Sequence, residues 1–466
     1  MVLLLVVTPT IISSSPISTY PPSGGGSGSP LVLAFGPGSD HIRHVITVVM
    51  ENHDYDNLFG TYCLTLGLYC SSTGNGVPSG LCVPYLPTDP QLGCVKPFNL
   101  TARELNVTDL PHDWISGTAA YANGSMNDFF HAESDSLVSF GHYNGSTVPI
   151  SWDLAEQYAL GDNFFAANLS YSLPNHWDLL AGGTPTIAYD SYVKNGSDRV
   201  AYLNQANATP SIQDLLNGTP VSWNYYDFPL ENQTTAYSSS SWDSAYDFWS
   251  PLAGRAESYQ PNESVHFVAR QQLLTDLSDG SLPQLSWVIP SAPYSEHPGY
   301  NITEGEGWLA QVVDAVEASP DWATTAIFVV WDDYGGWYDH VAPTFDGPDL
   351  LSFRSPILVI SPYAREGLIS SQYLTFFSLL HFDEWQFGLG CLTSLDCNAP
   401  LPFSFFNFNQ TARLPIMFPT NWLQASYPMP PQSLGAPPIL CPSCGAQNEQ
   451  SWSYDGDPEL NVSLGD

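Results

Sequence analysis

The sequence feature that most constrains the fold is an uninterrupted apolar run at residues 326–331, followed at once by the polar stretch Asp332-Asp-Tyr-Gly-Gly-Trp-Tyr-Asp-His340. An apolar run rich in β-branched residues predicts a strand buried on both faces, as in the parallel sheets of α/β domains. Ligands of such sheets bind beyond the carboxyl ends of the strands, where this chain carries two adjacent carboxylates, two glycines and a histidine. The alternative is a solvated turn, because Asp and Gly are common turn residues.

The same pattern recurs elsewhere in the chain. Further apolar runs predict three more buried strands, at residues 44–50, 283–290 and 356–361. The first run ends in Glu51 and Asn52, the second is followed by Glu296 and His297, and the third has no comparable acid after it. Carboxylates gathered on one edge of a sheet repel one another unless a cation joins them. The pattern therefore predicts a divalent metal site with oxygen ligands.

A candidate nucleophile lies in the segment from Ser170 to Gly182. Pro174 is well placed for the first turn of a helix that runs to Gly182, which puts Ser172 at the amino-terminal end of that helix. Exposed N–H groups and the helix dipole stabilise an alkoxide there and bind a phosphate oxygen. The alternative is that Ser172 is an ordinary N-cap residue.

Charge and composition limit the partners of this chain. It has 46 acidic residues against 10 basic ones, for a formal net charge of −36, so nucleic acid and anionic membranes are poor partners near neutral pH. Only 12% of the residues are charged, whereas a salt-adapted protein would raise its total charge. At a pH of about 3 to 4 most surface carboxylates approach or fall below their pKa values. The composition therefore favours an acidic working medium.

Sequons and cysteines indicate an extracellular or cell-surface protein. Thirteen Asn-x-Ser/Thr sequons occur from Asn99 to Asn461, a density typical of a displayed glycoprotein, although a chain rich in Asn and Ser produces several by chance. The eight cysteines fall into near neighbours, as local disulfides would, and zinc binding is the alternative. The predicted pairs are Cys63/Cys70, Cys82/Cys94, Cys391/Cys397 and Cys441/Cys444.

The chain divides into three predicted regions. Residues 1–30 form a leader-like segment with a Gly/Ser linker, residues 31–400 form the catalytic domain, and residues 401–466 form a Pro-rich tail packed on that domain. About residues 183–280, which are rich in Tyr, Trp, Ser and Asn, are interpreted as a cap inserted over the site. Helices are expected at about residues 115–122, 307–316 and 373–388.

Two motifs resemble those of a known family. Residues 51–60, Glu-Asn-His-Asp-Tyr-Asp-Asn-Leu-Phe-Gly, resemble the E-N-H-S/D-F/Y-D-N-x-F-G signature of the phosphoesterase family that contains bacterial phospholipases C and acid phosphatases. Residues 331–341 are similar to the W-D-E-Y-G-G-F-Y-D-H-V motif of that family, with Asp333 in place of the frequent Glu. Segments around His112 and His297 also resemble family segments in the right order. The resemblance covers roughly residues 41–398.

The resemblance implies an alkaline-phosphatase-like α/β fold, with a central, mostly parallel sheet flanked by helices. It implies one divalent metal ion, held by Glu51, Asn52, Ser172, Asp332 and Asp333. Ser172 matches the Ser/Thr nucleophile of the family. The remaining catalytic candidates are His112, His297 and His340, which match positions near the phosphate, and His176, which occupies a position that is Arg in some phospholipases.

The resulting prediction is a secreted or cell-surface acid phosphatase that hydrolyses phosphomonoesters through a phosphoserine intermediate. A phospholipase C-type phosphodiesterase is the alternative with the same chemistry, and its aromatic cap could contact a choline-like cation or a membrane surface. A non-catalytic cell-surface glycoprotein on an inherited hydrolase fold is a third alternative. The joint presence of all five predicted metal ligands argues against it.

Overall fold

The structure is a computed structural model of the 466-residue chain. It describes residues 40–66, 76–100, 107–184, 201, 204–227, 249–255, 257–346 and 349–418. The predicted leader at residues 1–30 lies outside the described residues, as do residues 419–466 of the predicted tail.

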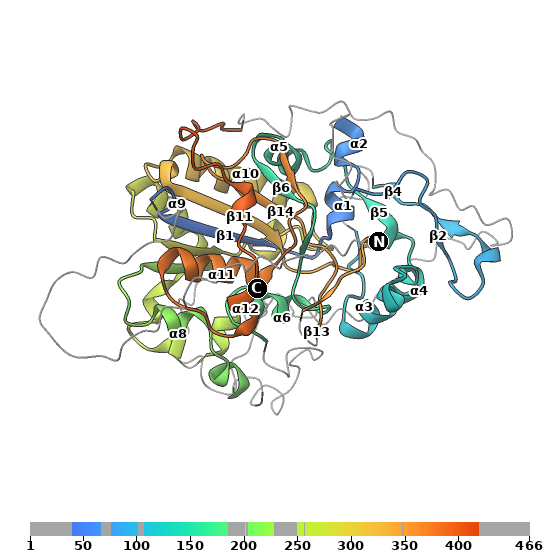
Figure 1. Cartoon of the computed structure of the whole chain (residues 1–466), viewed down its shortest axis with the longest axis horizontal. Helices are drawn as coiled ribbons and strands as arrows, with labels where there is room; N and C mark the ends of the chain where they lie inside the picture. Colours follow the sequence, from blue (N-terminus) through green and yellow to red (C-terminus); the bar gives the residue numbers. More distant parts are fainter. Residues whose placement is uncertain are drawn as a thin grey trace, which may run out of the picture. The chain divides into compact units, whose positions relative to one another are not determined.

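An eight-stranded sheet forms the centre of the described structure, with the strand order β15-β6-β14-β11-β1-β10-β8-β9 (Figure 1). Its strands are β1 (His44–Met50), β6 (Ala159–Gly161), β8 (Trp223–Asp227), β9 (Phe267–Ala269), β10 (Leu285–Val288), β11 (Thr325–Trp331), β14 (Ile357–Ile360) and β15 (Leu368–Ser370). Neighbouring strands are parallel except that β14 runs antiparallel to both β11 and β6. The predicted mostly parallel α/β sheet is therefore confirmed.

Strands β1 and β11 form the middle of this sheet. They pair in parallel from His44 opposite Thr325 to Met50 opposite Trp331. Every residue of β11 is buried, which explains its continuous apolar sequence: a strand covered on both faces has no solvent-facing side to make polar. Because Met50 and Trp331 lie in register, the chain leaves both strands at the same edge of the sheet. The residues that follow, Glu51 and Asp332, therefore start side by side.

The antiparallel direction of β14 explains why no acid follows it. Its carboxyl end lies at the edge of the sheet opposite to the carboxyl ends of β1 and β11. The residues before β14 lie instead at the site edge, where the Ser355 hydroxyl donates to the carbonyl of Trp331 at 2.5 Å. The buried strand was predicted from its sequence, but its direction was not.

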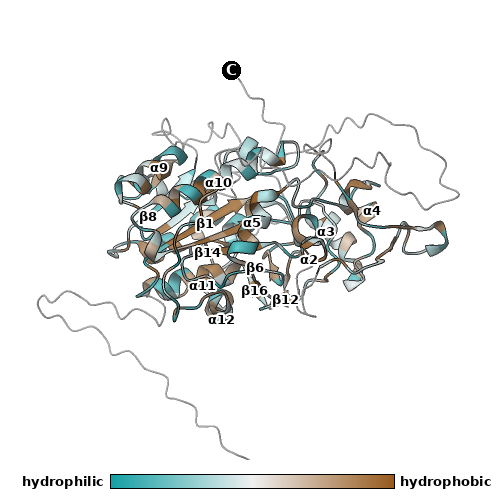
Figure 2. Ribbon diagram, turned by 90° about the horizontal axis from the view of Figure 1, so that it is seen from above, coloured by the Kyte–Doolittle hydropathy of each residue, from teal (hydrophilic) through white to brown (hydrophobic). Residues whose placement is uncertain are grey.

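Helices cover both faces of the sheet. The described α-helices are α1 (Tyr55–Phe59), α2 (Tyr62–Leu66), α3 (Trp114–Tyr121), α4 (Phe129–Ala132), α5 (Pro149–Gln157), α6 (Ser172–Asp178), α8 (Ile212–Leu216), α9 (Arg270–Asp279), α10 (Ile302–Ala318), α11 (Phe376–Phe387) and α12 (Ser394–Asn398). Helices α5, α9 and α10 share one hydrophobic core with the sheet, and α8 and α11 share another on the opposite face. Figure 2 shows the apolar strands between these two layers. The three predicted helices correspond to α3, α10 and α11.

Short strand pairs lie outside the central sheet. They are β2 (Val83–Pro84) with β3 (Cys94–Val95), β4 (Phe98–Asn99) with β5 (Gly141–His142), β7 (Phe164–Phe165) with β16 (Leu374–Thr375), and β12 (Phe345–Asp346) with β13 (Asp349–Leu350). The pair β7 and β16 is parallel, and it joins the segment before the candidate nucleophile to the start of α11.

The interpretation of about residues 183–280 as a cap is wrong for the described part of that segment. Strands β8 and β9 belong to the central sheet, and α9 packs against α10. The sequence of β8, Trp-Asn-Tyr-Tyr-Asp, lacks a Val/Ile run, but aromatic residues also favour strands. Residues 185–200 and 228–248, which hold much of the expected cap, lie outside the described residues.

Part of the tail packs on the surface of the domain, and local disulfides link nearby segments. Tail residues up to 418 pack on the domain, with Phe405 fully buried and the Trp322 indole donating to the Arg413 carbonyl at 3.0 Å. The predicted disulfides Cys82–Cys94 and Cys391–Cys397 are present. Cys63 is also disulfide-bonded, whereas Cys70, Cys441 and Cys444 lie outside the described residues. Within the described ranges, no helix has the length and apolar character needed to cross a bilayer.

Candidate active site and metal centre

The loops after β1 and β11 are tied to each other at the edge of the sheet. The backbone N–H of Asn52 donates to Asp332 Oδ1 at 2.8 Å, and the N–H of Asp333 donates to the same oxygen at 2.8 Å. Gly335 has a φ of +57°, and a Cβ there would lie 2.1 Å from the Asn52 carbonyl oxygen. A glycine at this position lets the two loops approach each other. The Asp332-Asp333 pair is therefore a buried part of the site, not a solvated turn.

Ser172 lies between these two loops. It is the first residue of α6, and the N-cap position belongs to Tyr171, so the ordinary N-cap interpretation is wrong. The fully buried Ser172 hydroxyl lies 3.0 Å from Glu51 Oε2 and 3.4 Å from both Asn52 Oδ1 and Asp333 Oδ2. Helix α6 ends at Asp178 instead of Gly182, but its amino-terminal end is where the sequence predicted it.

His176 contacts two of the predicted metal ligands. Its Nε2 atom donates to Glu51 Oε1 at 3.0 Å and lies 3.6 Å from Asp332 Oδ2. Burial raises the pKa of Asp332, but the interactions with His176, with Ser172 and with the Asn52 N–H outweigh burial and lower that pKa to about 2. Asp332 is therefore a charged carboxylate. The ligand atoms of Glu51, His176 and Asp332 all lie within 4.8 Å of one another.

His112 and His297 lie on either side of Asn52. Their Nε2 atoms are 3.3 and 3.2 Å from Asn52 Nδ2, and their Nδ1 atoms are each 2.6 Å from a backbone carbonyl, that of Leu110 or of Pro298. Because a carbonyl only accepts, Nδ1 carries the proton and Nε2 accepts from the Asn52 amide. This arrangement orients the amide so that its oxygen faces Ser172.

The residues present fit a hard divalent cation. Carboxylate, amide and hydroxyl oxygens from Glu51, Asn52, Ser172 and Asp333 converge as described, and all four residues are buried. Asp332 Oδ2 is buried and accepts no hydrogen bond from any residue that the structure describes. Three buried carboxylates and an unsatisfied oxygen form the environment that a cation with oxygen ligands stabilises. The structure thus brings all five predicted metal ligands together; their role in metal binding stays a prediction.

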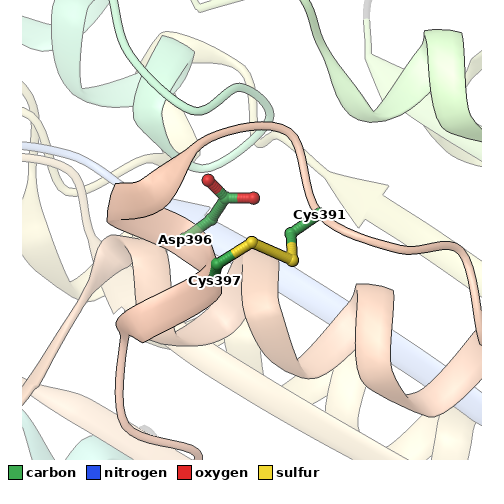
Figure 3. A group of neighbouring side chains, drawn as sticks. All are labelled: Cys391, Asp396 and Cys397. Atoms are coloured by element: carbon green, nitrogen blue, oxygen red, sulfur yellow. A yellow bond between two sulfur atoms is a disulfide. The ribbon is translucent and has the colours of Figure 1, made fainter. Parts of the chain in front are cut away.

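Two other groups of potential metal ligands occur among the described residues. Cys391, Asp396 and Cys397 lie close together, but their two sulfur atoms are bonded to each other and Asp396 caps α12 (Figure 3). The closed disulfide offers no thiolate to a cation. The other group contains His340, which was predicted to lie near the phosphate.

His340 contacts a different set of residues from the other predicted catalytic histidines. Its Nδ1 atom lies 2.6 Å from Asp56 Oδ2 and 3.4 Å from Arg354, and its backbone N–H donates to the same carboxylate at 2.9 Å. These contacts do not place it beside Ser172, so its predicted role near the phosphate gains no support from them. The sequence interpretation also missed Arg354, whose only signal is a basic residue just before an apolar strand in a chain with few basic residues.

His53 supports the fold. Its ring nitrogens lie 2.7 Å from Asn57 Oδ1 and 2.9 Å from the Glu296 carbonyl oxygen, and its ring stacks on Trp337. Burial lowers the pKa of His53 to about 4, with smaller opposing contributions from these two hydrogen bonds. It holds the loop after β1 against the loop after β10.

Comparisons with known proteins agree with these motifs. The sequence model described as the phosphoesterase family matches residues 42–390. The chain is 25% identical over 397 residues to a non-hemolytic phospholipase C of Burkholderia pseudomallei, covering 74% of this chain and 55% of that protein. It is 27% identical over 410 residues to phospholipase C B of Mycobacterium tuberculosis, covering 75% and 74%. It is 23% identical over 365 residues to non-specific phospholipase C6 of Arabidopsis thaliana, covering 71% and 64%.

A solved structure of a protein in the alkaline phosphatase superfamily from Vibrio parahaemolyticus matches with a TM-score of 0.34 and 16% identity, covering 55% of this chain and 64% of that one. The chain spans only about half the length of the Burkholderia relative. The family match nevertheless extends over well more than half of the 466 residues and includes both strand-end motifs of the site. This chain is therefore a member of the phosphoesterase family.

Proposed function

We propose that the chain is a metal-dependent phosphoesterase, and specifically an acid phosphatase that hydrolyses phosphomonoesters through a phosphoserine at Ser172. The observation that carries the proposal is the position of the Ser172 hydroxyl, buried 3.0 Å from Glu51 and 3.4 Å from Asn52 and Asp333. A serine surrounded by this many acceptor oxygens is poised to lose its proton when a cation is present. The family and the relatives named as phospholipases C support hydrolysis of phosphoric esters.

The chemistry follows from the positions of these side chains. A divalent cation held by the five predicted ligands would lower the pKa of the serine hydroxyl and screen the charge of the phosphoryl group. The Ser172 oxygen attacks phosphorus as the bond to the leaving oxygen breaks, and water then cleaves the phosphoserine to release phosphate. Protonation of Nε2 would end the hydrogen bond that each of His112 and His297 accepts from the Asn52 amide. The resulting imidazolium could bind a phosphoryl oxygen and protonate the leaving group.

A phospholipase C-type phosphodiesterase is the second candidate function. Aromatic rings lie beside both histidines: Tyr171 is 4.9 Å from His112, and Trp249 and Tyr300 are 6.1 and 6.5 Å from His297. Aromatic faces attract organic cations such as those of lipid headgroups. The names of the relatives favour the same candidate.

A comparison of two substrates separates these functions. We expect kcat/KM for a simple aryl phosphate to exceed that for an aryl phosphorylcholine by at least about 10-fold, because a phosphomonoester offers three nonbridging phosphoryl oxygens to the cation and the histidines, whereas a phosphodiester offers two. The measurement is the release of the aryl alcohol by the metal-loaded protein across a pH series. The reverse order of substrates would assign the phosphodiesterase, and no hydrolysis of either would favour the non-catalytic alternative.

An extracellular or cell-surface location in an acidic medium is part of the proposal. The sequons and disulfides support external display. Exposed sequon asparagines in the described structure include Asn99, Asn123 and Asn262, which are available for glycans. Asn168 is buried and donates hydrogen bonds to Asp178 and Thr184, so a glycan there would disrupt the segment before Ser172.

Buried acids that have no cationic partner in the described part of the chain support the acidic medium. Burial, with a contribution from the contact to Asp396, raises the pKa of Glu384 to about 10. Burial raises the pKa of Glu306 to about 7 even though Ser151 and Ile150 donate hydrogen bonds to it, and burial followed by repulsion from Glu306 raises the pKa of Glu296. The raised pKa values mean that these buried side chains are protonated, and therefore neutral, in the folded protein at acidic pH.

The free energy of unfolding is therefore expected to fall as the pH rises. Unfolded Glu loses its proton near a pH of about 4.3, whereas folded Glu306 keeps it to about 7 and folded Glu384 to about 10. Between these values the folded state binds the extra proton, so raising the pH destabilises it, for Glu306 by up to about 1.4 kcal/mol per pH unit. Denaturant unfolding at a series of pH values measures this slope. Glu384→Gln should flatten it above neutrality, and a stability that rises from acidic to neutral pH would contradict the interpretation.

A further inference from the structure

We propose that Arg354 is a positioning residue that fixes the spacing of the three chain segments carrying the predicted metal ligands and the nucleophile, and so sets the affinity of the site for its cation. The proposal rests on the metal-dependent function proposed above. It acts through the backbone segments that hold the cluster around Ser172.

The guanidinium of Arg354 contacts all three segments at once. Its Nη2 donates to Asp56 Oδ1 at 2.9 Å, its Nε donates to Asp339 Oδ2 at 2.9 Å, and its Nη1 donates to the Asp162 carbonyl at 2.9 Å. Arg354 is fully buried and lies just before β14, so the antiparallel direction of that strand brings it to the site edge of the sheet.

Each partner of Arg354 belongs to a segment that delivers part of the site. Asp56 lies in the first turn of α1, just after Glu51 and Asn52, and Asp339 follows Asp332 and Asp333 in the loop after β11. The third partner, Asp162, follows β6 and begins the segment that leads to Ser172. Arg354 thus joins all three segments through one side chain.

Backbone contacts reinforce this connection. The N–H of Tyr55 donates to the Arg354 carbonyl at 2.9 Å, and the Tyr55 ring lies 4.5 Å from the guanidinium. The N–H of Ser355 donates to the Phe164 carbonyl at 3.0 Å, in the segment before Ser172. The segments after β1 and β11 are thus joined beside the cluster, where Asn52 contacts Asp332, and farther along, where Arg354 bridges Asp56 and Asp339 and where His340 contacts Asp56.

The charges explain why an arginine is needed. Asp56 in α1 and Asp339 in the loop after β11 are buried carboxylates, and without the guanidinium they would repel each other and push the two segments apart. The planar fork of Arg donates to several acceptors in a fixed geometry, whereas a Lys ammonium is a point charge on a flexible stem. Arg354→Lys keeps the positive charge but loses the fixed three-way geometry.

The test measures cation binding directly. Protein stripped by chelation is titrated separately with Mg²⁺, Ca²⁺, Mn²⁺ and Zn²⁺ by calorimetry, and the tightest cation is used for the variants. We expect Arg354→Lys and Arg354→Met to weaken binding of this cation by about 10- to 100-fold, the range seen when groups that orient metal ligands are replaced. At saturating cation, Arg354→Lys should regain much of its activity toward aryl phosphate.

Arg255 offers a matched control. It is also a buried arginine that bridges two acids, with its Nη2 2.6 Å from Asp214 and 3.2 Å from Glu257, but these partners lie outside the three ligand-bearing segments. Arg255→Lys should lower the melting temperature while leaving the cation affinity within about 2-fold.

The outcomes separate this inference from the proposed function. An Arg354→Lys protein that loses stability as Arg255→Lys does, but binds the cation as the wild type does, would show a merely structural role and overturn the inference alone. A wild-type protein that binds none of the four cations would overturn the metal-dependent function together with this inference. If Arg354→Met fails to fold, the cation affinity of Arg354→Lys alone tests the inference.

Discussion

Replacing Ser172 with alanine is expected to lower kcat for phosphate ester hydrolysis by at least about 10⁴-fold, as removal of a nucleophile does in other hydrolases. The reason is that the Ser172 oxygen forms the covalent bond to phosphorus, and the alanine side chain has no atom that can replace it. The substitution removes one hydroxyl from a buried polar cluster, so the fold should persist. Steady-state hydrolysis of an aryl phosphate and thermal unfolding measure the two effects separately.

Ser361→Ala is the matched control for this prediction. The Ser361 hydroxyl is also fully buried and donates to the Thr325 carbonyl at 2.9 Å, at the opposite end of β11 from the site. Loss of this hydrogen bond should cost about 1 kcal/mol of stability and leave kcat unchanged. If Ser172→Ala retained activity comparable to that of Ser361→Ala, the nucleophile would have to be another residue.

Removing the cation is expected to have the second-largest effect, with a fall in activity of at least about 10²- to 10³-fold that is reversed when the cation is restored. The same step should destabilise the protein, because Glu51, Asp332 and Asp333 are then buried together without a compensating charge. A cation at about 1,000 times its Kd contributes about 4 kcal/mol to the free energy of unfolding.

Dialysis against a chelator, followed by calorimetric unfolding with and without added cation, measures this difference. Metal content determined by mass spectrometry shows whether the stripping is complete. Full activity and an unchanged unfolding temperature in protein free of metal would contradict a cation at the Ser172 cluster.

The sequence predicted the parts of the fold and site that depend on local pattern. The apolar runs of β1, β10 and β11 specify buried strands, and the polar residues after β1 and β11 meet because parallel neighbours end at the same edge. Pro174 indicated where α6 begins, and therefore that Ser172 lies at the amino-terminal end of that helix. These inferences need only the periodicity of the apolar residues and the position at which each helix or strand begins or ends.

The parts that were missed depend on contacts between distant segments. The apolar pattern of a four-residue buried strand such as β14 does not indicate its direction, so the antiparallel pairing could not be predicted. The position of Arg354 at the site edge depends on that direction and was missed for the same reason. The hydrogen bond from Arg354 to Asp56 joins residues 298 positions apart. Strand β8 was assigned to a cap because its aromatic and polar residues do not form the aliphatic run that marks its neighbours.

The most direct test of the central claim is to trap the phosphorylated enzyme. Metal-loaded protein is mixed with an excess of aryl phosphate, quenched in acid during turnover and digested for peptide mass spectrometry. One phosphate is expected on the peptide that contains Ser172, and none on that peptide in the Ser172→Ala protein. Steady turnover with the phosphate on a different residue would contradict it.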